Sequence, residues 1–407
     1  MATYTVVGRS IPRPDGVDKV TGQGRYAADC VPPGTLWGRA LLSPYPHARI
    51  LGIDTSRARQ LPGVHAVITA ADIVSGPWGR LIKDVPVLAV DRVRFAGERV
   101  AAVAAVDEDT AQQAIDLIDV TYEELPAVFD PLEALADSSP LLHPDFAAYP
   151  GADHFEGQSN AYTTTVQERG DLEAGFTAAD IIVENTYTTQ RVHQAYLEPQ
   201  SVLIKIDGGA VEVWTCSKSP YDTRNALALA VLEPEDNVVL NHTYVGGDFG
   251  GKQTPANLPI CYFLAKETGR PVCMVSDYLE EFMAANPRCS AILRLRTGVT
   301  RAGVITAHHA QAFLNTGAYA GFKPHGVIGH VVRAGWPGRT ACPTPASSRV
   351  RSTRTRCRAA TCGRPACLRA CSLPSRIWTR SLVGWTSIRW SSACGTSWRK
   401  AKRLPSA

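Results

Sequence analysis

The stretch Val245-Gly246-Gly247-Asp248-Phe249-Gly250-Gly251-Lys252, which reads VGGDFGGK, is the most informative part of this chain. Four glycines surround a single Phe, so the backbone can approach a ligand without obstruction by Cβ atoms. Residues 238–244 before it are typical of a strand, and residues 258–266 after it are typical of a helix that ends before Gly269 and Pro271. A glycine-rich turn between a strand and a helix is a common site for anionic ligand groups.

Two other interpretations of this stretch compete with a ligand-binding loop of that kind. A run of glycines can be a tight turn with no ligand at all. The stretch also satisfies most of the phosphate-binding pattern GxxxxGK[ST], through Gly246, Gly251 and Lys252. Position 253 is Gln, however, which lacks the hydroxyl that such a site offers to magnesium. The nucleotide-binding interpretation therefore fails at that residue.

The stretch resembles the molybdenum-cofactor loop of large subunits in the xanthine dehydrogenase and aldehyde oxidase family, which includes bacterial carbon monoxide dehydrogenase-like subunits. Shorter pieces along the chain resemble the same family in the same order, and together they cover residues from about 8 to 335. They are GRSIPR (8–13), DKVTG (18–22), RYAAD (25–29), SPYPHARI (43–50), PGV (62–64), VRFAGE (93–98), YEELPAV (122–128), GD (170–171), AD (179–180), LEP (197–199), WT (214–215) and NTGAY (315–319). The order and spacing make the match specific.

The resemblance implies a molybdenum–molybdopterin cofactor, expected in its cytosine dinucleotide form, that hydroxylates a small molecule with oxygen from water. It places Phe249 and Gly250 beside the oxo group of the metal, with glycines that allow a close approach, and it assigns no protein ligand to the metal. The expected cofactor-binding residues are Gly246, Gly247, Phe249, Gly250, Gly251 and Lys218. Lys218 stands where many members have a Gln that bonds to a molybdenum ligand, and a Lys offers only donors and a charge.

Two further residues are candidates for the substrate pocket. Gln253 stands where purine-oxidising members carry a Glu, so a carboxylate is missing and a purine substrate is disfavoured. Arg288 matches a position that orients substrate in some members, and a guanidinium suits an oxygen-rich or carboxylate group. A surface Lys218, a surface Arg288 and a Phe249 that only anchors the core are the simpler alternatives. We expect the motif from His193 to Pro199 to be structural.

The resemblance also implies partners. Iron–sulfur clusters and FAD belong to a small and a medium subunit, and the five cysteines before residue 334 show no cluster-binding spacing. The Glu that acts as general base in the family lies in a downstream portion that has no counterpart in this chain. We therefore expect a large subunit that is truncated and inactive as written. The alternative is a non-catalytic binding or assembly fragment without cofactor.

The pattern of apolar residues predicts an α+β protein. Residues 16–130 alternate strand-like and helical stretches, with strands predicted at 64–69, 100–106 and 119–123 and N-cap chemistry at residues 107–110 before a helix at 111–118. The resemblance identifies this unit as an α/β-hammerhead domain. Residues 131–160 are predicted to be a linker, and residues 161–335 the first part of a molybdopterin-binding α/β domain. In that domain the pattern predicts strands at 181–189, 201–206, 211–215, 238–244, 272–276, 291–297 and 305–313, and helices at 221–232 and 258–266. We expect two separate units, each with its own sheet. No secretory signal is visible, and no apolar run approaches the roughly 20 residues of a membrane helix, so a cytoplasmic location is expected.

The segment 336–407 differs in composition from the rest of the chain. From Ala334 onward there are thirteen Arg and two Lys but no Asp or Glu, together with six Cys and five Trp. A basic tail that binds nucleic acid is one interpretation, but disordered tails seldom accumulate Trp and Cys. No His accompanies the cysteines, whose spacing matches no common zinc site.

A shifted reading frame is a better explanation for this segment. GC-rich back-translation of residues 336–344, read from the third base, gives AGPYRMPH, and residues 357–367 give PGRHMRAPGV. Both phrases resemble the family at the expected places. Our hypothesis is that the frame is lost near Gly335, so that residues 336–407 have no native fold and no nucleic-acid partner.

Overall fold

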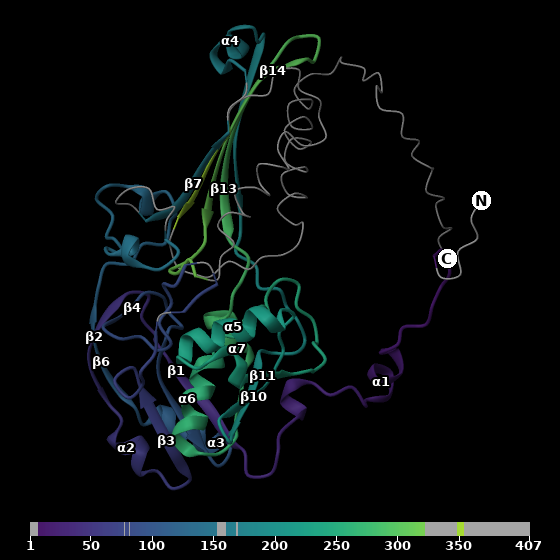
Figure 1. Ribbon diagram of the computed structural model, residues 1–407. Helices are drawn as coiled ribbons and strands as arrows, with labels where there is room; N and C mark the ends of the chain where they lie inside the picture. Colours follow the sequence, from purple (N-terminus) through teal and green to yellow (C-terminus); the bar gives the residue numbers. More distant parts are fainter. Residues whose placement is uncertain are drawn as a thin grey trace, which may run out of the picture.

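The elements of the N-terminal block begin and end close to where the residue patterns change. The computed structural model describes residues 7–76, 78–80, 82–152, 160–167, 170–321 and 348–353 (Figure 1). The elements up to residue 130 include strands at or near the expected 64–69, 100–106 and 119–123, together with three strands that the residue patterns did not predict, β1, β2 and β4. The helices and strands are α1 (Gly16–Thr21), β1 (Leu36–Leu42), β2 (Ala48–Asp54), α2 (Ser56–Gln60), β3 (Val64–Thr69), β4 (Arg92–Val93), β5 (Arg99–Ala105), α3 (Glu108–Asp116) and β6 (Asp119–Glu124).

Strand β5 shows why this part of the chain is so apolar. Every residue of its sequence RVAAVAA is buried, because helices cover both faces of the sheet at this strand. Ala102 and Ala104 belong to the core cluster that includes helix residues 258–265, whereas Ala101 and Val103 pack with residues of α3 on the opposite face. The carboxylate of Asp107 then accepts the amide of Thr110 and caps α3, as the sequence predicts.

The second block begins with a strand at residue 161 and follows the predicted order of strands and helices. Helix α7 is the main addition to that order. The elements are β7 (Ala161–Gln167), α4 (Leu172–Thr177), β8 (Ile181–Thr189), β9 (Ser201–Asp207), β10 (Ala210–Thr215), α5 (Pro220–Val231), β11 (Val238–Asn241), α6 (Leu258–Thr268), β12 (Val272–Val275), α7 (Tyr278–Ala284), β13 (Ser290–Val299), β14 (Ile305–Asn315) and β15 (Ser348–Thr353).

One sheet runs through both blocks, so the expectation of two units with separate sheets is wrong. Its seven strands have the order β11-β10-β9-β12-β1-β5-β3, and the junction is a parallel pair between β1 and β12, at Leu36 with Val272 and Trp37 with Cys273. The local pattern of each strand gives no information about this pairing, because the two strands lie far apart in sequence. The blocks therefore share one core rather than being joined by a linker alone.

Two smaller sheets complete the architecture, one in each block. Strands β4-β2-β6 form a three-stranded sheet, and β7-β15-β14-β13-β8 form the long five-stranded sheet at the upper end of Figure 1. Strand β15 lies within the segment expected to have no native fold, yet it pairs in parallel with β14 and antiparallel with β7. The remainder of 336–407 lies outside the described residues.

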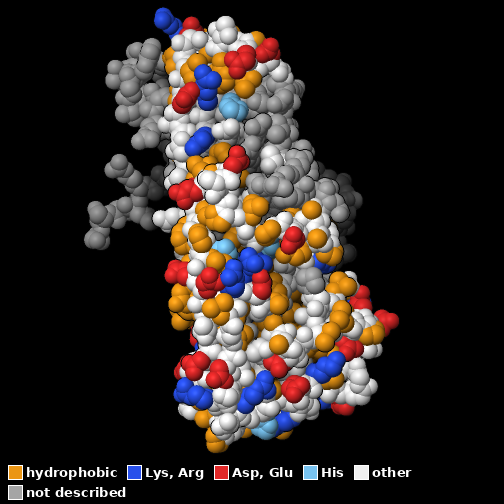
Figure 2. Space-filling view, turned by 90° about the vertical axis from the view of Figure 1, so that its left-hand side faces the viewer, with side chains coloured by type: hydrophobic (Ala, Val, Ile, Leu, Met, Phe, Trp, Pro, Cys, Tyr) orange, Lys and Arg blue, Asp and Glu red, His pale blue; other side chains and the backbone are white. Residues whose placement is uncertain are grey.

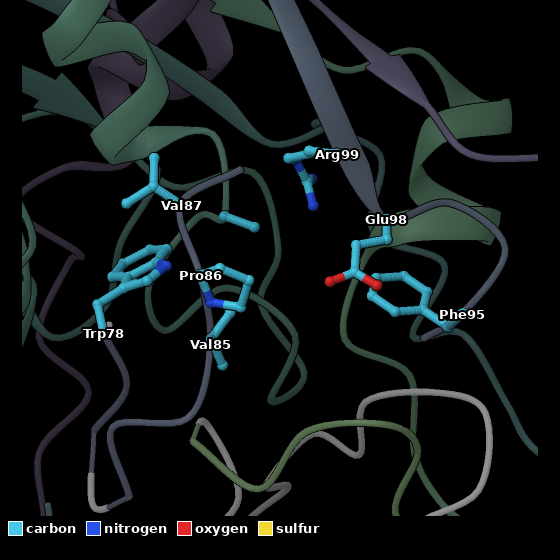
Figure 3. Close-up of a pocket in the computed structure, with 8 residues that line it drawn as sticks. Trp78, Val85, Pro86, Val87, Phe95, Glu98 and Arg99 are labelled. Carbon is cyan, nitrogen blue, oxygen red and sulfur yellow. The ribbon is translucent and has the colours of Figure 1, made fainter. Parts of the chain in front are cut away.

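Polar contacts also join the two blocks beneath the shared sheet. The guanidinium of Arg99 donates to Asn257, and the buried carboxylate of Asp84 accepts the amides of Ala320 and Gly321 at 2.7 Å each. Figure 3 shows Glu98 and Arg99 beside a cavity of about 10 Å³ that Trp78, Phe95 and Ala256 also line. The cavity has room for about one water molecule, so it belongs to the core.

One face of the molecule carries charges of both signs. Figure 2 shows basic and acidic side chains interspersed over the lower part of the face that carries β2 and β6, with no continuous basic stripe among the described residues of that face. None of the helices in the described ranges is long and apolar enough to span a bilayer.

Candidate functional site

The glycine loop connects β11 to α6 at one end of the seven-stranded sheet. The preceding strand ends at Asn241, earlier than predicted, and the following helix starts at Leu258 as predicted. Pro259 stands in the first turn of α6, where its missing amide costs nothing, and Gly269 ends the helix in the left-handed region. Residues 246–252 thus lie between two elements that are fixed in the core.

Asp248 organises the loop from within. Its Oδ1 accepts the amide of Lys252 at 2.8 Å, and its Oδ2 accepts the amide of Gly250 at 2.9 Å. The amide of Gly251 donates to the Asp248 carbonyl at 2.7 Å. Burial disfavours the charged carboxylate, but the bond from Lys218 and these amide bonds outweigh it and hold the pKa of Asp248 below its usual value. The carboxylate therefore stays ionised and keeps the turn closed.

Phe249 adopts a backbone conformation that is rare for its residue type. Its φ is +46°, in the left-handed region, and its side chain is 58% exposed. Such a conformation costs roughly 1–3 kcal/mol and persists where the surrounding structure enforces it, often at functional sites. Part of that enforcement comes from Arg288, whose Nη2 donates to the Phe249 carbonyl at 3.3 Å. The simpler alternative, a Phe buried as a core anchor, does not describe this residue.

The structure brings some of the predicted site residues together and leaves one apart. Lys218 lies against the loop, with its Nζ 2.9 Å from Asp248 Oδ2 and its amide donating to the Lys252 carbonyl. Gln253 instead lies beside the ion pair of Arg80 and Asp222, with its side-chain oxygen accepting from the Arg80 guanidinium at 2.7 and 3.2 Å. The side chain of Gln253 therefore binds to the Arg80–Asp222 pair at the surface.

The glycines permit a close approach within the protein. A Cβ at Gly251 would lie 2.6 Å from Cε1 of Tyr196, and a Cβ at Gly246 would lie 2.5 Å from Cβ of Glu198. At Gly247, where φ is +97°, a Cβ would be 3.1 Å from both the Phe249 ring and Tyr196. The structure thus shows that these glycines pack against the segment behind the loop.

That segment, residues 193–199, makes contacts to which the sequence assigns no specific partner. The Tyr196 hydroxyl donates to the buried carboxylate of Glu281 on α7, which also accepts the amide of Gln200. Burial and the adjacent Glu281 raise the pKa of Tyr196, so its hydroxyl stays protonated. Glu198 contacts the loop directly, with Oε2 2.6 Å from the amide of Gly246. A lone Glu between Leu and Pro gives no local signal of such a partner.

Comparisons with known proteins agree with this geometry. Residues 154–333 match the family described as molybdopterin cofactor-binding domain, and residues 21–126 match the aldehyde oxidase and xanthine dehydrogenase a/b hammerhead domain. The chain is 35% identical over 314 residues to a probable xanthine dehydrogenase subunit of Bacillus subtilis (strain 168), covering 77% of this chain and 40% of that protein. It is 33% identical over 323 residues to the nicotinate dehydrogenase large molybdopterin subunit of Eubacterium barkeri, covering 79% and 73%.

Solved structures give the same result for the fold. The reconstituted CO dehydrogenase from Oligotropha carboxidovorans superposes with a TM-score of 0.83 at 26% identity, over 92% of this chain and 48% of that one. For the aldehyde oxidoreductase from Desulfovibrio gigas the TM-score is 0.80 at 25% identity, over 91% and 42%. With the glycine loop, its supporting segment and both domain matches in place, the chain belongs to the molybdopterin-binding large subunits of the molybdenum-dependent oxidoreductases, the family of xanthine dehydrogenase and aldehyde oxidase.

Proposed function

We propose that the described residues form the cofactor-side part of a large subunit that hydroxylates an aldehyde or an N-heterocycle with oxygen from water. The observation that carries this proposal is the glycine loop itself. The amides of Gly247, Asp248 and Phe249 donate no hydrogen bond to the described residues, while the amides of Gly246 and of residues 250–252 do. The last residue of the first set is Phe249, whose φ lies in the left-handed region.

This arrangement fits the molybdenum cofactor of the family. Three consecutive donors that make no hydrogen bond to the described residues suit oxygen atoms of an anionic group, and the half-exposed ring of Phe249 can shield that group from water. When bound, the cofactor supplies oxygen transfer to an electrophilic carbon and accepts the electrons. Lys218 and Asp248 hold the loop in shape for this contact, and we propose the cytosine dinucleotide form of the cofactor.

An N-heterocycle is the first choice of substrate class. The relative from Eubacterium barkeri, of which the chain covers nearly three quarters, is named for nicotinate, and its name supports this choice. Arg288 lies at the loop with one donor on the Phe249 carbonyl, so its guanidinium charge is close to the proposed pocket. The Gln253 amide contacts Arg80 and supplies no carboxylate, which speaks against a purine.

Electrons would leave through an iron–sulfur small subunit and an FAD-binding medium subunit. Relatives whose names describe them as subunits or large chains support a complex of this kind. Cys216 and Cys273 suit packing better than ligation of a cluster, since burial raises the pKa of Cys216 to about 11 and that of Cys273 to about 12. Among the described residues there is no group of three or more His, Cys, Asp or Glu that could hold a metal.

We further propose that this chain alone retains no cofactor. Three open amides contribute about 1 kcal/mol each, whereas association costs at least roughly 4 kcal/mol of lost freedom. A fragment that serves binding or assembly without cofactor is the competing function.

The test is the molybdenum content, by mass spectrometry, of the chain co-expressed with iron–sulfur and flavin subunits. A version with the frame restored after Gly335 is measured in parallel, together with cytosine nucleotide released on acid treatment and oxidation of nicotinate and benzaldehyde. We expect metal, cytosine nucleotide and oxidation only with the restored version. If the restored version contains no molybdenum, the competing function, a binding or assembly fragment without cofactor, is supported instead. Stoichiometric molybdenum in the unrestored chain would refute the proposal that this chain retains no cofactor.

A further inference from the structure

The carboxylate of Glu198 connects both ends of the glycine loop. Its Oε2 accepts the amide of Gly246 at 2.6 Å and lies 2.7 Å from Nζ of Lys252. The Glu198 amide in turn donates to the Gly246 carbonyl at 3.3 Å. Residues 246 and 252 are thus held at one oxygen atom, which closes the loop at its base.

This ion pair lies inside the protein. The side chain of Lys252 is fully buried and that of Glu198 is 12% exposed. The Lys252 ammonium also lies 4.6 Å from the centroid of the Tyr196 ring. A buried charge that loses its partner is strongly unfavourable, so the two charges hold each other in place. Exposed pairs of the protein, such as Lys205 with Asp207, lack this constraint.

The fit around Glu198 leaves the loop no room to shift towards it. A Cβ at Gly246 would lie 2.5 Å from the Glu198 Cβ. Ala195, three residues before Glu198, is held at φ +53°, which marks the segment behind the loop as constrained too. The ion pair and the packing therefore fix the same end of the loop, next to the open amides that start at Gly247.

We propose that Glu198 and Lys252 form an ion-pair clip that sets the curvature of residues 246–252, and that Glu198 is a positioning residue for the cofactor contact. The clip itself follows from the geometry alone. The positioning role of Glu198 rests on the proposed function, because it requires that the amides of residues 247–249 bind the cofactor. A purely structural ion pair would stabilise the whole fold without a specific effect on the loop.

The decisive variant replaces both charges by neutral groups of similar size, Glu198→Gln with Lys252→Met. Single variants leave one buried charge unpaired and can fail to fold, whereas the double variant removes that problem. The control is Arg224→Met with Glu235→Gln, which neutralises a partly exposed ion pair between α5 and the turn that follows it. Amide hydrogen exchange of the full chain is measured for the loop and for strand β5, together with the rate of chymotryptic cleavage at Phe249.

We expect the double variant to show exchange about tenfold faster in the loop and faster cleavage at Phe249, with protection of β5 unchanged. The control variant should match the wild type in both regions. Unchanged loop exchange in the double variant, or equal loss of protection in β5 and in the loop, would overturn the clip.

The molybdenum content of the frame-restored subunit separates the two proposals. If the wild type binds molybdenum, the double variant should lose several-fold of it, and full retention would refute the positioning role. If the wild type binds none, the proposed function fails, while loop exchange still decides on the clip.

Discussion

Replacing Gly251 by Ala tests how the loop is supported. The new Cβ would lie 2.6 Å from Cε1 of Tyr196 and 3.0 Å from the side-chain amide of Gln194. Ordinary carbon contacts are about 3.5–4.0 Å, so the ring must move by about 1 Å. Tyr196 has little freedom to move, because it is almost fully buried and its hydroxyl is bonded to Glu281.

The magnitude follows from these contacts. Overpacking in a dense region costs about 1–3 kcal/mol, and weakening a hydrogen bond to a charged group adds about 1 kcal/mol, so we expect a loss of roughly 2–4 kcal/mol. At about 2–4 °C per kcal/mol for a protein of this size, the melting temperature should fall by roughly 4–16 °C. The assay is thermal unfolding followed by circular dichroism and by tyrosine fluorescence.

Gly52→Ala is the matched control, because a Cβ at Gly52 in β2 would meet nothing within 4 Å. That variant should melt within about 2 °C of the wild type. If Gly251→Ala melts together with Gly52→Ala, the loop does not press against Tyr196, and close packing is not the reason for a glycine at position 251.

Three other perturbations test separate parts of the structure. Phe249→Gly relieves the left-handed strain, so we expect the free energy of unfolding, measured by chemical denaturation, to be unchanged or raised by about 1 kcal/mol. The molybdenum content of the frame-restored subunit should fall in the same variant. A lower free energy of unfolding would show that Phe249 is not strained. Burial lowers the pKa of His308 to about 4, whereas the same side chain in the unfolded protein takes up its proton near pH 6.5. The unfolded state therefore binds one more proton between these pH values. We expect the free energy of unfolding to fall by up to about 1.4 kcal/mol per pH unit between pH 6.5 and 4. Urea denaturation at several pH values should show that the free energy of unfolding changes less with pH in His308→Gln than in the wild type. An equal pH dependence in the two proteins would exclude this residue as the cause. Asp107→Ala removes the cap of α3 and should cost about 1 kcal/mol in the same assay, with Asp116→Ala at the other end of that helix as the control that stays near wild type.

Local sequence patterns predicted most of the secondary structure, because burial on one or two faces leaves a periodic signal. Strand β8 and strand β3 have the predicted bounds, and β5 differs by one residue at each end. Helix α7 was not predicted, since its sequence YLEEFMA places Leu279 and Phe282 on the exposed side and so lacks an apolar face directed inward. A helix can be predicted from its apolar residues only when those residues are the buried ones.

The loop was recognisable in the sequence, but its internal bonding was not. In the sequence Asp248 is only one residue of the glycine-rich stretch, whereas in the structure its carboxylate closes the turn. The partnership of Glu198 with Lys252 joins residues 54 positions apart, and neither residue carries a local sign of the other. Contacts of this kind depend on how elements are arranged in space, which periodicity does not encode.

The pairing of β1 with β12 also affects how the chain can be made. During synthesis β1 leaves the ribosome 236 residues before its neighbour, since Leu36 pairs with Val272. At a synthesis rate of about 5–20 residues per second, β12 follows β1 after roughly 10–50 s. Until then β1 is an open edge of the partial sheet that it forms with β5 and β3. Throughout this time its backbone donors and acceptors are open to the edges of other nascent chains. The order of strands in the finished sheet therefore predicts a dependence on chaperones that bind nascent chains, and a yield that rises when translation is fast between residues 42 and 272.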